Sequence, residues 1–286
     1  MFMPTFTQAP PVKSTRRTTL DTGVFTRQTA GSQSLERGLQ LLRAFRPGVT
    51  VLSNSELADR TGLPRPTVSR LTRSLVDAGF LQYDLGTKAY RLAAVFLSLS
   101  DAFQYATPGM DVALDLIRKM AEHEKINVGL AIADQHEMIY LAALRKSEDG
   151  ISRTRRLVPG SRVPVEATAV GRACLSLLPE GQREELLLQI ASKYGEKWVN
   201  LKSDILRSMD ELSRIGYCTA VWLPGLIGIG TAIRAPDGIV YGVNISFQFE
   251  KESRDQLVER YAPMLLQLAR DIQRAWQENA TLEEGF

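Results

Sequence analysis

Two short helices joined by a glycine turn constrain the fold of this 286-residue chain more than any other feature. Ser53 and Glu56 have the spacing of a capping box, which starts a helix by satisfying two backbone amides reciprocally. Gly62 supplies the left-handed conformation that ends this helix. Pro66 suits the first turn of a second helix, which Gly79 ends. The pattern therefore predicts two helices that meet at a sharp turn.

The flanking residues extend this pair into a larger predicted unit. Leucines at helical spacing from Ser34 onward predict a preceding helix, and residues 80–92 read as strand, turn and strand. Three helices with a terminal hairpin form a winged helix-turn-helix, whose second motif helix enters the major groove of DNA. The predicted base-contacting side chains are Arg65, Thr67, Ser69, Arg70 and Arg73. Lys88 and Arg91 of the wing are predicted to contact phosphates.

The charge is distributed unevenly along the chain. Residues 1–33 carry a net charge of +3, residues 34–92 carry +4 and the remainder carries −4. A basic front end on an acidic body is typical of a protein whose first third meets a polyanion. The alternative is a small helical subdomain with a solvated basic face. The agreement of cap, turn, apolar stripe and hairpin favours binding of double-stranded DNA.

Composition excludes several classes of protein. The chain has two cysteines and two histidines, too few for a structural zinc site of the usual ligand count or a disulfide framework. We expect residues 1–33 to be a disordered tail without a secretory signal, and the protein to be cytoplasmic. Residues 215–233 are uncharged and long enough to span a membrane, but their glycines and Pro224 favour buried strands instead. No membrane partner, metal or cofactor is predicted.

The remaining chain is predicted to form a linker helix over residues 93–107 and an α+β domain over residues 108–280. Within that domain we expect helices near 110–124, 168–178, 180–193, 203–214 and 252–278. The predicted strands are 126–133, 138–144, 217–222, 226–234 and 240–248.

Several of these segments resemble the IclR family of bacterial transcriptional regulators. In the predicted DNA-binding part they are residues 34–42, 55–58, 61–64, 67–71 and 75–81. Residues 160–173 are similar to the family pattern G-x-x-x-P-x-x-x-[ST]-A-x-G-[KR]-A, and residues 226–246 resemble its paired final strands. The resemblance implies a winged-helix domain at 34–92, the linker helix and a GAF-like α/β effector-binding domain. It also implies a homodimer or a dimer of dimers.

A candidate effector site begins at Thr168, a plausible helix cap. The amides of Ala169, Val170 and Gly171 would lie at a helix N-terminus, where backbone donors and the helix dipole favour an anion. The alternative from the residues alone is an ordinary cap, with Gly171 allowing tight packing on a sheet. The resemblance favours the acid group of an organic effector at this position.

By the same resemblance, strand residues face this helix start. The predicted contacts are Cys218, Trp222, Gly228, Asn244 and Ser246. Core packing is an equally good interpretation of Trp222. The sequence departs from many members, which have Cys where Gly228 falls and an acidic residue upstream, where residues 218–222 are uncharged. A flatter, larger or aromatic acid therefore fits better than a small keto acid.

Two other functions remain alternatives. A thiol-dependent enzyme would need Cys174 or Cys218 beside a histidine, and neither His123 nor His136 has a sequence reason to approach them. An architectural DNA-binding protein would need no small-molecule effector. The second domain would then be unusually large for a part that binds no ligand. We therefore expect a sequence-specific, non-enzymatic regulator of transcription that is modulated by a small organic acid, aromatic acids included.

Overall fold

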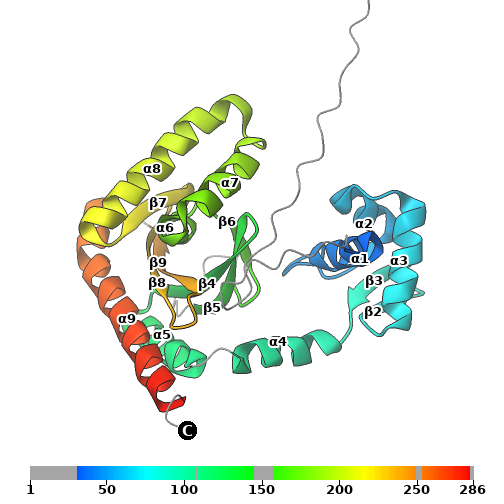
Figure 1. Ribbon diagram of the computed structural model, residues 1–286, viewed down its shortest axis with the longest axis horizontal. Coiled ribbons are helices and arrows are strands. Elements are labelled where there is room, and N and C mark those ends of the chain that lie inside the picture. Colours follow the sequence, from blue (N-terminus) through cyan, green and yellow to red (C-terminus); the bar gives the residue numbers. More distant parts are fainter. Residues whose placement is uncertain (1–30, 107–108, 145–156, 249–252, 284–286) are drawn as a thin grey trace, which may run out of the picture. The chain divides into compact units, whose positions relative to one another are not determined.

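The computed structural model describes residues 31–106, 109–144, 157–248 and 253–283 (Figure 1). Residues 1–30 of the predicted disordered tail lie outside the described residues.

The first region is a small helical domain with a three-stranded sheet. Its elements are α1 (Gln33–Arg43), β1 (Leu52–Ser53), α2 (Asn54–Thr61), α3 (Arg65–Asp77), β2 (Leu81–Asp84) and β3 (Ala89–Leu92). The strand order is β1-β3-β2, and every pairing is antiparallel. Leu41, Leu57, Val68 and Leu81 are fully or almost fully buried and bring the three helices and the hairpin together in one core.

The predicted turn chemistry is confirmed in detail. Ser53 Oγ accepts a hydrogen bond from the Glu56 amide at 3.3 Å, while a Glu56 carboxylate oxygen accepts from the Ser53 amide at 2.8 Å. Gly62 has a φ of +69° and its amide bonds to the Ala58 carbonyl, which closes α2. A residue with a Cβ would be strained at that φ. The chain therefore turns into α3 where the sequence predicts.

Helix α4 (Val95–Tyr105) follows, within the predicted linker range of 93–107. None of its residues is buried. Leu97 is 72% exposed and Tyr105 is 90% exposed, although the helix is apolar along much of its length. Such a helix is unlike an ordinary surface helix, which keeps its apolar side chains on a core-facing stripe.

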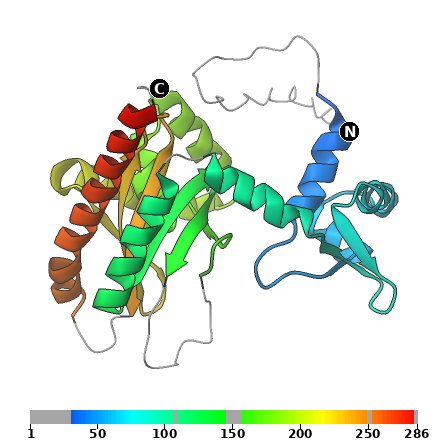
Figure 2. The same ribbon diagram turned by 90° about the horizontal axis from the view of Figure 1, so that it is seen from below.

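The α+β region is built on a six-stranded antiparallel sheet of order β6-β5-β4-β9-β8-β7. Its strands are β4 (Asn127–Asp134), β5 (Glu137–Leu144), β6 (Arg162–Pro164), β7 (Cys218–Leu223), β8 (Leu226–Arg234) and β9 (Val240–Gln248). Helices α5 (Met110–Glu124) and α9 (Arg254–Glu283) lie side by side over one face (Figure 2). They form the larger core with Leu130, Val243 and Ile245.

The opposite face carries α6 (Ala169–Leu177), with α7 (Glu180–Ala191), the short helix η1 (Gly195–Lys197) and α8 (Trp198–Ile215) beyond it. Four glycines, Gly129, Gly228, Gly230 and Gly242, lie on this face in neighbouring strands. A Cβ on Gly230 would lie 2.5 Å from the Ala169 carbonyl carbon, and one on Gly242 would lie 2.4 Å from Val170 Cγ2. The absence of side chains at Gly230 and Gly242 allows α6 to pack directly on the strands.

Some element boundaries differ from the sequence predictions. Helix α8 begins at Trp198 rather than near residue 203, because η1 leads directly into it and Trp198 packs against the core beside α6. The short strands β1 and β6 were not expected from the sequence. Each has two or three residues, too few for alternation of polar and apolar residues to reveal it.

Candidate functional site

Helix α3, the predicted recognition helix of the motif, presents a polar and basic outer surface. Arg65, Ser69, Arg70 and Arg73 are exposed, and Thr67 is half-buried. Val68 and Leu71 on the opposite side are buried in the domain core. This division is what a helix needs to insert into a groove without losing its attachment to the domain.

Ser69 has a partner that the sequence analysis did not find. The Asn54 side-chain amide donates a hydrogen bond to Ser69 Oγ, which links the first turn of α2 to the recognition helix. The sequence signal for this contact was the position of Asn54 at a helix start, directly after the capping serine Ser53. Ser69 is therefore held in position by the first helix of the motif.

The wing between β2 and β3 is a tight turn. The Asp84 carboxylate accepts hydrogen bonds from the amides of Gly86 and Thr87, which lower the pKa of this carboxyl below its usual value. Lys88 has a φ of +52°, and the Arg91 guanidinium donates to the Gln82 side chain at 3.0 Å. Both cations are exposed, one at the tip of the wing and the other on the strand β3.

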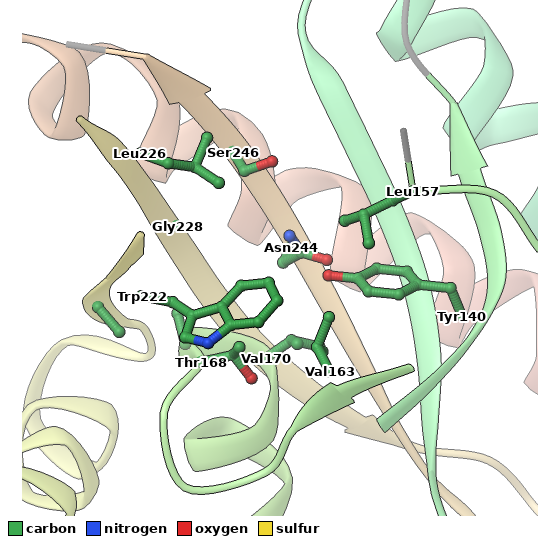
Figure 3. Close-up of a pocket in the computed structure, with 12 residues that line it drawn as sticks. Tyr140, Leu157, Val163, Thr168, Val170, Trp222, Leu226, Gly228, Asn244 and Ser246 are labelled. Atoms are coloured by element: carbon green, nitrogen blue, oxygen red, sulfur yellow. The ribbon is translucent and has the colours of Figure 1, made fainter. Parts of the chain in front are cut away.

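The α+β region contains a cavity between the start of α6 and the sheet (Figure 3). Its empty volume is about 410 Å³, which includes the mouth that opens to solvent. Trp222 and Tyr140 enter from opposite sides. Of the residues predicted to contact an effector, the lining includes Thr168, Ala169, Val170, Trp222, Gly228, Asn244 and Ser246.

The first turn of α6 differs from the prediction in which groups are available. Thr168 caps the helix, but its hydroxyl oxygen accepts from the Gly171 amide at 3.2 Å and its hydroxyl hydrogen is donated to the Pro164 carbonyl at 2.8 Å. Gly171 does not line the cavity, because it packs against the backbone of Val165. In the described part of the chain, the amides of Ala169 and Val170 remain without a hydrogen-bond acceptor.

Cys218 also lies outside the cavity, contrary to the prediction. It is fully buried beneath α6, where its thiol contacts the Ala169 carbonyl at 3.5 Å. The backbone pairing explains this position, since Cys218 lies opposite Gly230, the glycine on which the start of α6 rests. Burial raises the pKa of Cys218 and of Cys174 to about 12. Neither thiol has the access or the ionisation that a nucleophile requires.

Five lining residues were missed by the sequence analysis: Tyr140, Leu157, Val163, Ala220 and Leu226. Tyr140 reaches the cavity face because the register between β4 and β5 shifts between Leu130 and Ala131. Burial raises the pKa of the Tyr140 phenol, and hydrogen bonding by the Asn244 side chain acts in the opposite direction. A bulge of this kind leaves no signal in the alternation of polar and apolar residues.

Asn244 is the buried polar group at the centre of the lining. Its side chain is on β9, the residue is 6% exposed, and its Oδ1 atom has no hydrogen-bond partner among the described residues. Such an atom is costly to leave unpaired in a folded protein. Together with the two amides of α6, it marks the cavity as a place for a polar ligand.

The described residues contain no cluster of three or more metal-ligating side chains. Among the helices in the same part of the chain, none is long and apolar enough to cross a membrane.

Comparison with protein families gives two matches in chain order. The IclR helix-turn-helix domain matches residues 34–85, and the bacterial transcriptional regulator IclR C-terminal domain matches residues 109–274. The chain belongs to the IclR family. This membership agrees with the winged helix at one end, the GAF-like α/β domain at the other and the helix between them. IclR proteins bind DNA through the first of these domains and regulate transcription.

Individual IclR proteins resemble the chain over most of its length. The HTH-type transcriptional regulator TsaQ1/TsaQ2 of Comamonas testosteroni is 28% identical over 250 residues, covering 84% of this chain and 87% of that protein. The p-hydroxybenzoate hydroxylase transcriptional activator of Acinetobacter baylyi is 24% identical over 252 residues, covering 83% and 89%. A crystal structure of an IclR family regulator from Brucella abortus has a TM-score of 0.77 at 30% identity, covering 91% and 99%.

Proposed function

We propose that this IclR-family regulator binds a specific operator as a dimer and that a small organic acid in the α6 cavity modulates this binding. The observation that carries the effector proposal is the cavity itself. It places two unbonded amides at a helix N-terminus and an unpaired buried amide oxygen within one set of lining residues. A helix N-terminus favours an anion, and a carboxylate is the organic anion that two adjacent amides suit.

The shape of the lining supports an acid with a flat apolar body. Trp222 and Tyr140 supply aromatic walls, and Leu157, Val163 and Leu226 complete an apolar surface. A Cβ on Gly228 would lie 3.6 Å from Ala169 Cβ, an ordinary contact distance. The missing side chain at Gly228 therefore enlarges the cavity and is not required for α6 to pack on the sheet. One relative is named as the transcriptional activator of p-hydroxybenzoate hydroxylase, and p-hydroxybenzoate is an aromatic acid.

The proposed DNA contacts are Arg65, Thr67, Ser69, Arg70 and Arg73 in the major groove, with Lys88 and Arg91 on phosphates. All of these residues on α3 and the wing are exposed except Thr67, which is half-buried, and this exposure supports the assignment. The apolar, unburied helix α4 supports assembly with a second copy, because pairing would cover Leu97, Leu99 and Tyr105. A two-fold dimer would read two half-sites of a palindromic operator. Such dimers could also pair into a tetramer.

A combined binding experiment tests the proposal. A thermal-shift screen of aromatic and aliphatic carboxylates on the full chain identifies acids that raise the melting temperature, since a ligand bound preferentially by the folded state stabilises it. Operator titrations with and without each stabilising acid then measure modulation, and sedimentation gives the assembly state. Operator binding that no stabilising acid changes would favour an architectural DNA-binding role instead.

A further inference from the structure

The unpaired oxygen of Asn244 has no counterpart elsewhere in the cavity lining. Asn244 lies in the middle of β9, opposite Gly129 on β4 and Gly230 on β8. Since neither glycine has a side chain, the flanking strands supply no hydrogen-bond donor beside it at these positions. The oxygen is buried and has no hydrogen-bond partner among the described residues, and Figure 3 shows it directed toward Tyr140 across the cavity lining.

The glycines also fix what surrounds this oxygen. A Cβ on Gly129 would lie 2.7 Å from Asn244 Oδ1 and 2.4 Å from Tyr140 Cε1, so its absence makes room for both side chains. A Cβ on Gly230 would lie 2.7 Å from the Val170 amide nitrogen. The first turn of α6 therefore packs over β8, the strand that pairs with β9 at Asn244. Neighbouring strands of a sheet lie ~4.8 Å apart.

An amide oxygen accepts hydrogen bonds and does not donate them. A ligand whose carboxylate binds the Ala169 and Val170 amides would leave Asn244 Oδ1 buried and unpaired unless it also carried a donor. We propose that Asn244 is a specificity-determining residue, which selects acids that bear a hydroxyl or amino group. This inference rests on the proposed effector function and defines the chemical class of that effector.

The selection follows from the cost of an unpaired group. An acid without a donor displaces water from Asn244 and leaves Oδ1 without a hydrogen bond. An acid with a donor replaces the hydrogen bond from water with one of its own. Sites that bond a ligand hydroxyl reject the analogue without it more strongly than apolar pockets reject a change in size. We expect the preference for the donor-bearing acid to be about 10- to 100-fold in affinity.

The test uses ligand series that differ at one group. Calorimetry on the full chain would compare benzoate with 2-, 3- and 4-hydroxybenzoate and with the corresponding aminobenzoates. Methoxybenzoates serve as probes that keep the oxygen as an acceptor but cannot donate. We expect at least one hydroxy or amino isomer to bind about 10- to 100-fold more tightly than both benzoate and its own methoxy analogue. Equal or tighter binding of the methoxy analogue in every series would overturn the inference.

Variants assign the preference to this residue. Asn244→Leu keeps the approximate size of the side chain and removes the acceptor, so it should abolish the difference between the preferred acid and benzoate. Asn200→Leu makes the same change on the exposed surface of α8 and should leave the difference intact. Persistence of the full preference in folded Asn244→Leu would overturn the assignment. If that variant does not fold, the comparison of donor and methoxy ligands on the wild-type chain still decides the ligand class.

The outcomes also separate this inference from the proposed function. If acids bind and change operator affinity but show no preference for a donor, the inference fails and the effector function stands. If no acid of this series or of the wider carboxylate screen binds, the effector function fails and the inference fails with it.

Discussion

Gly230 and Asn244 lie directly opposite each other in the ladder between β8 and β9. The glycine admits the start of α6, and the asparagine places an unpaired oxygen beside it. The two residues thus bring a helix N-terminus and a buried polar side chain to the same place on one sheet.

Gly230→Ala should therefore damage both the domain and its ligand site. The new Cβ would lie 2.5 Å from the Ala169 carbonyl carbon, a backbone atom that cannot move without shifting α6. We expect a loss of about 1–3 kcal/mol in the free energy of unfolding, as for other overpacked cores. Gly181→Ala in α7, where nothing lies within 4 Å of the added Cβ, is the control. Urea denaturation of both variants measures the difference, and equal stability would contradict close packing at Gly230.

The sequence predicted the DNA-binding domain more completely than the cavity. Ser53, Glu56 and Gly62 act through hydrogen bonds and backbone angles within a few residues, so local pattern is enough to place them. The cavity instead depends on pairings between strands far apart in the chain. Tyr140 enters through a register shift, and Cys218 is excluded by lying opposite Gly230. Gly171 was misassigned because its amide is already bonded to the Thr168 cap.

Arg70→Ala and Arg73→Ala should weaken operator binding by about 1–3 kcal/mol wherever the arginine contacts a base. Folding should be preserved, because both side chains are exposed while Val68 and Leu71 hold the helix. Gel-shift titrations measure the affinity, with Arg118→Ala on α5 as a control for the removal of one exposed arginine. Unchanged affinity in both α3 variants would remove this helix from the major groove.

The wing variant Lys88→Ala/Arg91→Ala should weaken binding to operator and to random DNA alike. Cations that neutralise phosphates release counterions, so the slope of log affinity against log salt should decrease by roughly one for each phosphate that is no longer neutralised. The ratio of operator to random affinity should stay the same, since phosphates carry no sequence information. Titrations at several salt concentrations test this expectation. A slope equal to that of the wild type would place the wing away from the DNA.

The two thiols make stability depend on alkaline pH. Burial raises the pKa of Cys174 and Cys218 to about 12 in the folded state, above the value of about 9 expected when exposed. The unfolded chain therefore loses these protons first as the pH rises, and folded-state stability should decrease between about pH 9 and pH 12. Below pH 9 their contribution is constant. Cys174→Ser/Cys218→Ser, compared with the wild type by urea denaturation across this range, should show a smaller decrease, while an identical decrease would assign it to other groups.

Ser246→Asp tests whether the effector is an anion. Ser246 lines the cavity on the strand next to Gly228 and is half-buried, so a carboxylate there remains partly solvated and the domain should fold. Val170 is a poorer position for the same test, because it is 1% exposed and its Cγ2 packs closely over Gly242. The added charge should repel a bound carboxylate, and we expect affinity for the acid identified by the thermal-shift screen to decrease about 10- to 100-fold. Ser246→Asn has nearly the same size without the charge and should bind more tightly than Ser246→Asp. Calorimetry on both folded variants measures the difference. If the aspartate variant binds the acid as tightly as the asparagine variant does, the acid group is held outside this cavity.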